Sequence, residues 1–403
     1  MTTPVSVVHI ITKLELGGAQ QNTLFTVSHL DPRRFRPILI TGEPGMLDDE
    51  ARGLSGVEFH QVPSLVRPIQ PAADLRALLG LTRLLRRLRP VIVHTHSSKA
   101  GILGRWAARL AGVPIIIHSI HGFGFTPGQQ PLLQRLLIGL ERTTGRFTTR
   151  FIAVSDANRR LGMKLGFFPV ERCTVIRSGI DLSRFKHTHI DVGKKKRELG
   201  LDPERPVVGM IAPLKPQKAP LDFVRVAALV RKVRPEAQFL LIGDGELRSE
   251  VEAAAQRQGL ADSFRLLGWR RDIAEILRCL DVFVLTSRWE GLPRVYLEAL
   301  ASGVPIVGTN VDGAAEVVHE GVNGYLVEPG DVGRMAKEVL GLLADAEQAR
   351  RMGRQGQSLS KEFDIHEMVR RQEEEYERLI VSLASGRAAV YSTSREEPRR
   401  EIW

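Results

Sequence analysis

The chain has 403 residues, of which 43% are apolar, and a formal net charge of +11. This length exceeds that of most domains with a single hydrophobic core, so we predict two domains of ordinary size. The two cysteines, Cys173 and Cys279, lie in different halves, which argues against a disulfide framework and favours a reducing cytoplasm.

The N-terminal half alternates short apolar runs with helical patterns. It begins with MTTPVSVVHIIT, which lacks the charged start and long apolar core of a signal peptide. The runs SVVHIIT, RPILIT, VIVHTH, PIIIHSI and FIAVS are separated by helical stretches such as ADLRALLGLTRLLRRLRP. Such alternation is typical of a parallel sheet covered by helices. We therefore expect a Rossmann-like domain over residues 1–185.

A glycine pair follows the first predicted strand. Gly17 and Gly18 stand in KLELGGAQQNTLF, just before a helical pattern. Paired glycines let the backbone approach a ligand closely, as a diphosphate site requires. The competing interpretation is that glycine merely fits the strand-to-helix turn.

Four histidines lie at the ends of two predicted strands. His94 and His96 alternate onto one strand face, which suggests a metal pair, although no cysteine or carboxylate accompanies them. His118 and His121, in IHSIHGFGFTP, are expected at a strand end and in a glycine-rich loop facing a cleft. A neutral histidine there can bond a sugar hydroxyl, whereas a purely structural histidine is the alternative.

Two helical stretches of this half mix leucine with arginine. They are DLRALLGLTRLLRRLRP and PLLQRLLIGLERTTGRFTTR. Packing against a sheet explains apolar stripes by itself. A second interpretation is that one basic, apolar face rests on an anionic membrane. No segment reaches the roughly 18–20 apolar residues that span a bilayer, so we expect a soluble or peripheral protein.

The pattern breaks after about Arg184 and then resumes. The polar, basic stretch KHTHIDVGKKKRELGLDPERP predicts a linker over residues 186–206. The runs VVGMIA, QFLLIG, FRLLG, VFVLTS and PIVGT then predict a second Rossmann-like domain over residues 207–365. Residues 366–384 read as an amphipathic helix that crosses back to the first domain, and residues 385–403 as a disordered tail.

Cationic side chains follow the first strand of the second half. Lys215 and Lys218, in MIAPLKPQKAPLDFV, are expected where that strand opens onto the cleft, and either can meet a phosphate unless both are simply solvated. The segment IGDGELRSEVE imitates a dinucleotide fingerprint but has Arg248 where the third glycine would fall, which disfavours a nicotinamide dehydrogenase. The chain has no Walker loop and no nucleophile elbow.

Two glutamates bracket a loop and a helix start further along the chain. In SRWEGLPRVYLEALASGVPIVGTNVDGAAEVV, Glu290 is expected in a loop after the strand DVFVLTS, and Glu298 in a helix closed by Gly303. The start of such a helix presents free N–H groups suited to a phosphate. Taken alone, both glutamates are compatible with solvated surface positions.

These segments together resemble the family-4 retaining glycosyltransferases. The resemblance rests on GGAQ, IHGFGF, PLKPQKAPLDF, GDGELR, LLGWRRDI and the glutamate segment, in this order, and covers the chain up to about Ala384. It implies the GT-B fold, which is two doubly wound Rossmann-like domains facing across a cleft. The implied donor, a nucleotide-sugar, binds mainly to the second domain and the acceptor mainly to the first.

The resemblance assigns roles to individual residues. Glu290 matches the glutamate beside the transferred sugar, Glu298 the one that bonds the ribose, Lys218 the lysine that neutralises the diphosphate, and His121 the loop histidine near the sugar. Glu290, His121 and Lys218 are thus the expected catalytic residues. The expected donor-binding residues are Gly17, Gly18, Lys215, Lys218, Trp269, Arg270, Glu290, Gly291, Leu292, Arg294, Val295 and Glu298.

The chain departs from the family pattern beside the lysine. Pro213 replaces an arginine, and Ala219 replaces the glycine that follows Lys218. Proline cannot bind phosphate, so we expect Lys215 to supply the missing charge.

The resemblance implies transfer of a hexose or N-acetylhexosamine from a nucleotide-sugar, with a UDP-sugar favoured, to a glycan or lipid-linked acceptor. It implies retention at the anomeric carbon and no essential metal, as the absence of an Asp-x-Asp pair also suggests. The expected location is the cytoplasm, including the inner face of the plasma membrane. The alternatives are a GT-B epimerase or phosphorylase and an inactive nucleotide-sugar-binding subunit. Nucleic acid is not an expected partner, because the KKKR run suits the linker.

Overall fold

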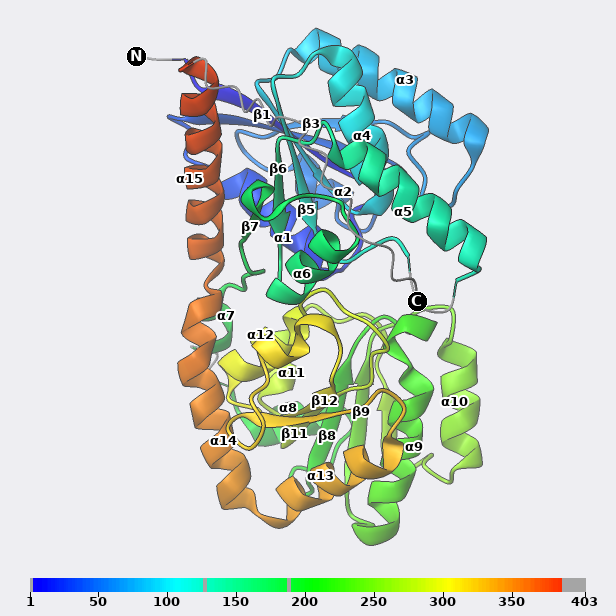
Figure 1. Cartoon of the computed structure of the whole chain (residues 1–403). Helices are drawn as coiled ribbons and strands as arrows, with labels where there is room; N and C mark the ends of the chain where they lie inside the picture. Colours follow the sequence, from blue (N-terminus) through cyan, green and yellow to red (C-terminus); the bar gives the residue numbers. More distant parts are fainter. Residues whose placement is uncertain (1–2, 126–128, 187–189, 386–403) are drawn as a thin grey trace.

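The protein consists of two α/β domains arranged one above the other, as the computed structural model in Figure 1 shows. The structure describes residues 3–125, 129–186 and 190–385. The predicted tail, 385–403, therefore lies outside the described residues except for Ser385. Within each domain every paired strand runs parallel to its neighbour, which confirms the predicted doubly wound fold class.

The N-terminal domain is built on a seven-stranded sheet in the order β3-β2-β1-β4-β5-β6-β7. Its strands are β1 Val5–Ile11, β2 Phe35–Thr41, β3 Glu58–Gln61, β4 Ile92–His96, β5 Ile115–Ile120, β6 Arg150–Ala153 and β7 Cys173–Val175. Its helices are α1 Gly18–His29, α2 Asp48–Arg52, α3 Pro71–Leu88, α4 Ser98–Ala111, α5 Pro131–Gly145 and α6 Asp156–Lys164, with the 3-10 turn Val170–Arg172.

The C-terminal domain is built on a six-stranded sheet in the order β10-β9-β8-β11-β12-β13. Its strands are β8 Val207–Ile211, β9 Gln238–Ile242, β10 Phe264–Leu266, β11 Val282–Leu285, β12 Ile306–Thr309 and β13 Gly324–Val327. The helices from the domain junction onward are α7 Leu182–Lys186, α8 Val192–Glu198, α9 Pro220–Val233, α10 Arg248–Arg257, α11 Ile273–Leu277, α12 Arg294–Ser302, α13 Val332–Ala344, α14 Ala346–Leu359 and α15 Ile365–Ala384, with 3-10 turns at Pro216–Lys218, Asp312–Glu316 and Ser360–Phe363.

The predicted linker over 186–206 is only partly a linker. Its KKKR run forms α8, and Lys195 bridges Asp272 and Glu275 at 2.7 Å each. Leu199 and Leu201 are buried in the core of the C-terminal domain. These apolar side chains and ion pairs anchor the segment to that domain, and a reading of composition alone misses such partners because they lie about 80 residues away in the sequence.

The last helix crosses from one domain to the other. Figure 1 shows α15 running along the edge of the molecule from the C-terminal domain up the side of the N-terminal one. Its residues Ile365, Met368, Val369, Tyr376 and Leu379 are buried in one core cluster with Val7 and Phe35 of the N-terminal sheet. This helix therefore covers one face of the N-terminal sheet and ties the two domains together.

The domains also touch near the cleft. Arg177 pairs with Asp156 at 3.2 Å and, across the junction, with Glu316 at 3.0 Å. The Glu316 carboxylate also accepts the backbone N–H of Ala157 at 3.0 Å, at the start of α6.

Among the described helices none is both long and apolar enough to cross a bilayer.

Candidate active site

The loop between β11 and α12 carries the first predicted glutamate. The buried run Val282–Leu285 forms β11, and Pro293, whose fixed φ suits a helix start, precedes α12. The helix ends at Gly303, whose φ of 75° is the left-handed conformation that glycine accepts without strain. The predicted strand, loop and helix are thus confirmed here.

Glu290 is buried in this loop and is held by several hydrogen bonds. Its Oε1 accepts bonds from Lys218 Nζ and, at 2.5 Å, from Ser287 Oγ. Its backbone N–H donates to Asp312 Oδ2 at 2.6 Å. Asp312 adopts a left-handed φ of 42°, and burial raises the pKa of its carboxyl. The carboxylate of Glu290 is therefore held in one orientation.

Glu298 is also buried, contrary to a surface assignment. It lies one turn along α12 from Arg294, whose Nε is 3.7 Å from Glu298 Oε1. Burial raises the pKa of Glu298, and Arg294 opposes that shift. Arg294 also donates to Gln21 of α1, and a Cβ added at Gly18 would lie 3.4 Å from Arg294 Cβ. The glycine loop of the N-terminal domain thus lies against the start of α12, and its contact with a diphosphate stays a prediction.

Lys218 reaches Glu290 because two loops are fastened together. Gln217 Nε2 donates to Trp289 O at 2.8 Å, and Arg288 N donates to Gln217 O at 2.7 Å. Arg288 also pairs with Asp222 of α9 at 2.7 Å. Ala219 adopts φ 45° and ψ 52°, which explains why glycine is usual after this lysine.

Lys215 lies near Lys218 and Glu290, whose charges both affect its pKa. Burial is the largest cause of the lowered pKa of Lys215, and the positive charges of Lys218 and Arg67 lower it further. Among the described residues, no hydrogen bond or ion pair is made by its ammonium group. Pro213 shapes the backbone, since its carbonyl accepts the N–H of Lys215 at 2.9 Å.

Replacing Lys215 with alanine should weaken donor binding by about tenfold, because one charge-assisted bond to phosphate would be lost. Calorimetry with the nucleotide diphosphate measures this directly. Lys232→Ala, at the far end of α9, is a matched control for loss of one charge. Unchanged affinity in Lys215→Ala would show that this lysine does not replace the arginine missing at Pro213.

The predicted base-binding loop borders the GDGELR segment. Gly243 N donates to Gly268 O at 2.9 Å, which places Trp269 and Arg270 beside that segment. Trp269 is exposed, whereas the Arg270 guanidinium is committed to Asp272 at 2.8 and 2.6 Å. A contact of this loop with a base stays a prediction, with Trp269 as the available side chain.

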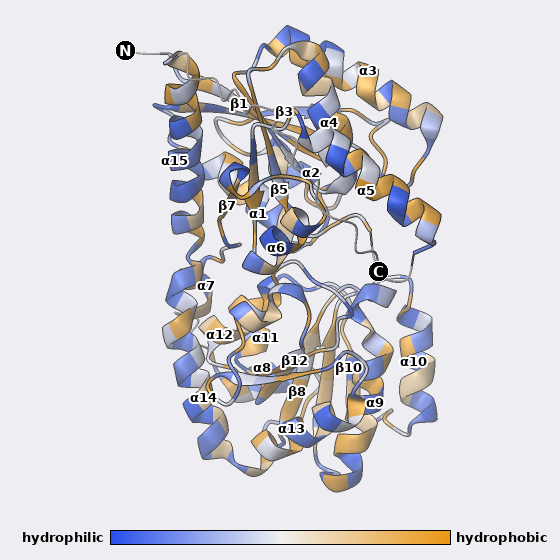
Figure 2. Ribbon diagram, viewed as in Figure 1, coloured by the Kyte–Doolittle hydropathy of each residue, from blue (hydrophilic) through white to orange (hydrophobic). Residues whose placement is uncertain are grey.

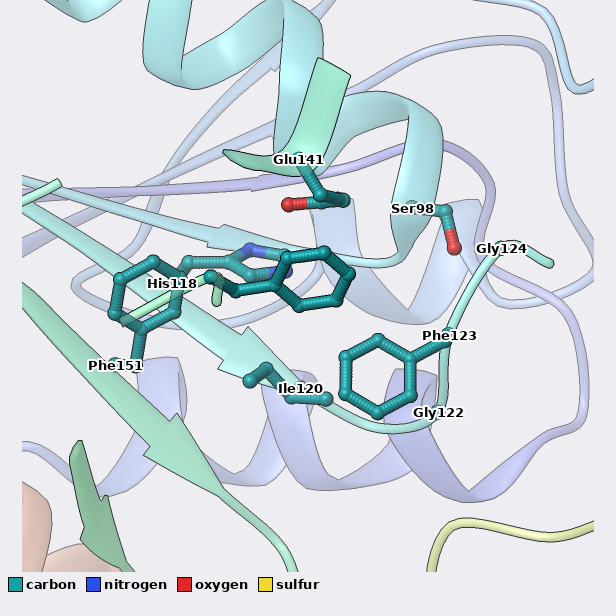
Figure 3. A pocket seen from close by; sticks show the side chains of 9 residues that line it. Ser98, His118, Ile120, Gly122, Phe123, Gly124, Glu141 and Phe151 are labelled. Carbon is teal, nitrogen blue, oxygen red and sulfur yellow. The ribbon is translucent and has the colours of Figure 1, made fainter. Parts of the chain in front are cut away.

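His121 and His118 differ in their surroundings. A Cβ added at Gly291 would lie 2.2 Å from the backbone O of His121, so the His121 loop touches the Glu290 loop across the cleft. His118 is buried inside β5 and bonds Thr95 Oγ1 at 2.9 Å. Figure 3 shows it in a small pocket with Phe151, Glu141 and Phe123. His118 therefore lies near the end of β5 and His121 in the loop that follows, as predicted, and the buried His118 side chain fits the structural alternative.

His94 and His96 share one face of β4, as predicted, and His9 joins them. Their ring nitrogens lie within 4.8 Å of one another, a spacing compatible with a metal ion. The nitrogens are also hydrogen-bonded: His9 Nδ1 lies 3.0 Å from His96 Nε2, and His94 lies 2.6 Å from the Tyr376 hydroxyl. Neither His9 nor Tyr376 stands in a motif, so sequence reasoning missed them. Ser287 and Asp312 were missed for the same reason.

The comparisons agree with this geometry. Residues 16–184 match the model described as Glycosyltransferase Family 4, and residues 191–359 match Glycosyl transferases group 1. An Escherichia coli protein named UDP-Gal:alpha-D-GlcNAc-diphosphoundecaprenol alpha-1,3-galactosyltransferase is 35% identical over 331 residues, which cover 81% of this chain and 85% of that protein. The chain belongs to glycosyltransferase family 4. It is therefore an enzyme of the transferase class.

A further relative and a solved structure are similar to this chain over most of its length. A Campylobacter jejuni protein named N,N'-diacetylbacillosaminyl-diphospho-undecaprenol alpha-1,3-N-acetylgalactosaminyltransferase is 26% identical, with 77% of this chain and 83% of that protein covered. The structure of Anabaena Alr3699/HepE in complex with UDP and glucose superposes with a TM-score of 0.80 at 22% identity, covering 93% of this chain and 100% of that one. The structural likeness shows the GT-B fold.

Proposed function

We propose that this family 4 enzyme is a retaining hexosyltransferase. It moves a hexose or N-acetylhexosamine from a UDP-sugar to a lipid-linked glycan acceptor, without a metal. The observation that carries the proposal is the contact between the Gly291 and His121 loops, because it brings the donor-site groups of one domain against the other domain. The donor and acceptor classes are supported by the named activities of the Escherichia coli and Campylobacter jejuni relatives.

The site suggests how departure of the diphosphate is assisted. The N–H groups of Arg294 and Val295 stand at the start of α12, while Lys218 contacts Glu290 in the preceding loop and Lys215 lies near Lys218. Such preorganised positive charge stabilises the negative charge that grows on the leaving phosphates. Glu290 lies beside Lys218 and is held by it and by Ser287, so we assign it to orienting the sugar and facing its developing positive charge. Closure of the cleft on the donor would exclude water that would otherwise hydrolyse it.

The experiment is an assay of the purified protein with a panel of nucleotide-sugars and diphosphate-linked polyprenol glycans. A bound donor should raise the melting temperature by several degrees, since about 2.7 kcal/mol is gained at a hundredfold excess over Kd. Transfer should yield a product with the anomeric configuration of the donor, read by NMR. It should persist in EDTA. An inverted product or loss of activity in EDTA would contradict the proposed mechanism, and hydrolysis or epimerisation without transfer would contradict the function.

We also propose that α5 rests on an anionic membrane. Leu132, Leu136 and Leu140 follow one another at four-residue spacing and are all exposed, Leu132 to 80%. Packing against the sheet does not account for these three side chains. Arg135 and Arg142 are exposed on the same helix, and Figure 2 shows apolar and charged residues intermixed along it. An acceptor anchored in a bilayer would require such a face.

The wild-type enzyme should float with anionic liposomes at low salt and be released by high salt, because each arginine near the surface contributes about 1 kcal/mol. Leu132→Ser combined with Leu136→Ser should lower the bound fraction severalfold by removing apolar area. Val233→Ser, at a residue of the C-terminal domain that is 63% exposed, serves as the control. Equal flotation of all three proteins would remove α5 as the docking face.

A further inference from the structure

A continuous chain of hydrogen bonds runs from His121 into the N-terminal domain. His121 Nε2 lies 3.2 Å from His96 Nδ1, and His96 Nε2 lies 3.0 Å from His9 Nδ1. His9 Nε2 lies 3.4 Å from the hydroxyl of Tyr376. That hydroxyl lies 2.6 Å from His94 Nδ1, and His94 Nε2 lies 2.8 Å from Ser119 Oγ. The loop histidine is thereby linked to α15.

Strand register explains why these side chains meet. His9 of β1 is paired with His94 of β4, and partners in register point to the same face of a sheet. His96 lies two residues beyond His94, so it shares that face. Tyr376 belongs to α15, the helix that covers this face. The link to Tyr376 therefore exists only because α15 returns to the N-terminal domain.

The ring geometry favours shared protons over a metal ion. The rings of His9 and His96 are coplanar within 8° and have centroids 5.3 Å apart while their nitrogens are 3.0 Å apart. The rings thus meet edge to edge, with one proton between two facing nitrogens. A zinc ion would instead need both nitrogens directed at a third point about 2.0–2.1 Å from each.

The four histidines are neutral. Burial lowers the pKa of His121 to about 4 and that of His9 to about 3, and it lowers the pKa values of His94 and His96 well below the usual range. A neutral imidazole has one N–H donor and one acceptor nitrogen. A ring that accepts a hydrogen bond on one nitrogen must therefore donate from the other. The tautomer of the histidine at one end of the series then determines the tautomer of the histidine at the other end.

The two contacts of Tyr376 indicate that direction. An O–H donor gives short contacts, and the 2.6 Å separation from His94 Nδ1 is short, whereas 3.4 Å to His9 Nε2 suits the weaker acceptance of an N–H. The phenol then donates to His94 and accepts from His9, His9 accepts from His96, and His96 accepts from His121. We propose that Tyr376 is a positioning residue that holds His121 as its Nε2–H tautomer through His9 and His96.

This arrangement leaves His121 Nδ1 as an acceptor for a substrate hydroxyl. The consequence for transfer rests on the proposed function, since it assigns His121 to receiving a hydroxyl hydrogen of the donor sugar or the acceptor. The tautomer itself is a property of the protein without substrate. It can therefore be measured whether or not the proposed reaction occurs.

Tyr376→Phe tests the proposal, because it keeps the ring and removes the hydroxyl. His9 then has no acceptor for its Nε2–H. A buried N–H without a partner is costlier than a buried ring nitrogen without one. The hydrogen bonds of the histidines should therefore all reverse direction, which leaves His9 Nε2 without a proton. We expect Nδ1 of His121 to become the protonated nitrogen and Nε2 the unprotonated one. The ¹⁵N chemical shifts of the two nitrogens should interchange accordingly. We expect kcat to fall by about tenfold, the equivalent of one hydrogen bond, with the donor KM little changed.

Val369→Ala is the control, because it removes packing from the same buried face of α15 without touching the chain of histidines. It should lower the melting temperature and leave both the His121 signals and kcat unchanged. His9→Gln acts from β1 if Tyr376→Phe does not fold: its amide can turn either way, so His121 should become a mixture of tautomers. An unchanged tautomer in the folded variants overturns the proposal, even if kcat falls. A switched tautomer in a protein that transfers no sugar would support the relay and refute the function.

Discussion

A Glu290→Gln enzyme is expected to bind UDP at least as tightly as the wild type and to transfer sugar about a hundredfold more slowly. Lys218 is held by Glu290 in the free protein, so removing the negative charge leaves the lysine more available to the diphosphate. Under the proposed mechanism, however, the sugar loses the carboxylate that faces its developing positive charge. Loss of one such preorganised group typically costs about 10²–10³ in kcat.

Calorimetry with UDP and single-turnover transfer kinetics separate these two effects. Glu347→Gln, at an exposed position of α14, is a control for the loss of one carboxylate. Near-normal transfer by Glu290→Gln would remove Glu290 from the catalytic site. A loss confined to UDP binding would instead make Glu290 a structural partner of the diphosphate site.

Replacing Lys218 with methionine should produce two effects of different origin. The Glu290 carboxylate would lose its counter-ion in a buried site, which should destabilise the fold by about 3 kcal/mol. The diphosphate would lose its cation both in binding and in departure, so donor affinity and kcat should each fall by at least tenfold, as loss of a charge-assisted bond implies.

The double variant Lys218→Met with Glu290→Gln distinguishes the two effects. Because no unpaired buried charge remains, its melting temperature should return toward the wild-type value while transfer stays low. Denaturation curves and initial rates measure both quantities. If stability does not recover, the ion pair is not the source of the loss; if transfer recovers, Lys218 has no role in departure of the diphosphate.

Local pattern predicted the loop that carries Glu290 well. The run DVFVLTS is apolar throughout, as a strand buried on both faces must be, and Gly303 ends the following helix in the left-handed conformation that glycine adopts freely. Lys218 and Glu290 were each assigned a separate role through the family resemblance, without a contact between them. Their contact comes from bonds between two loops, as Gln217 with Trp289 shows, and these bonds carry no local signature.

The KKKR run shows where local pattern misleads. Its composition suits a solvated linker, yet Lys195 is nearly enclosed by Asp272, Glu275 and Glu198. Charge along the chain does not reveal which charges of the opposite sign the fold will place nearby. His118 is a similar case, since its position at a strand end does not tell which face of the sheet its side chain occupies.

The sequence by itself determined the two doubly wound domains, the loops that hold the donor-site residues and the helix start behind Glu290, because strand and helix periodicity and turn residues act over a few neighbours. The tertiary structure alone decided the partners of Glu290, the burial of Glu298 and the line of histidines from His121 to Tyr376. These depend on strand register and on the return of α15, which join residues as much as 367 positions apart. Contacts over such separations arise from the packing of whole elements, and no short stretch of sequence encodes them.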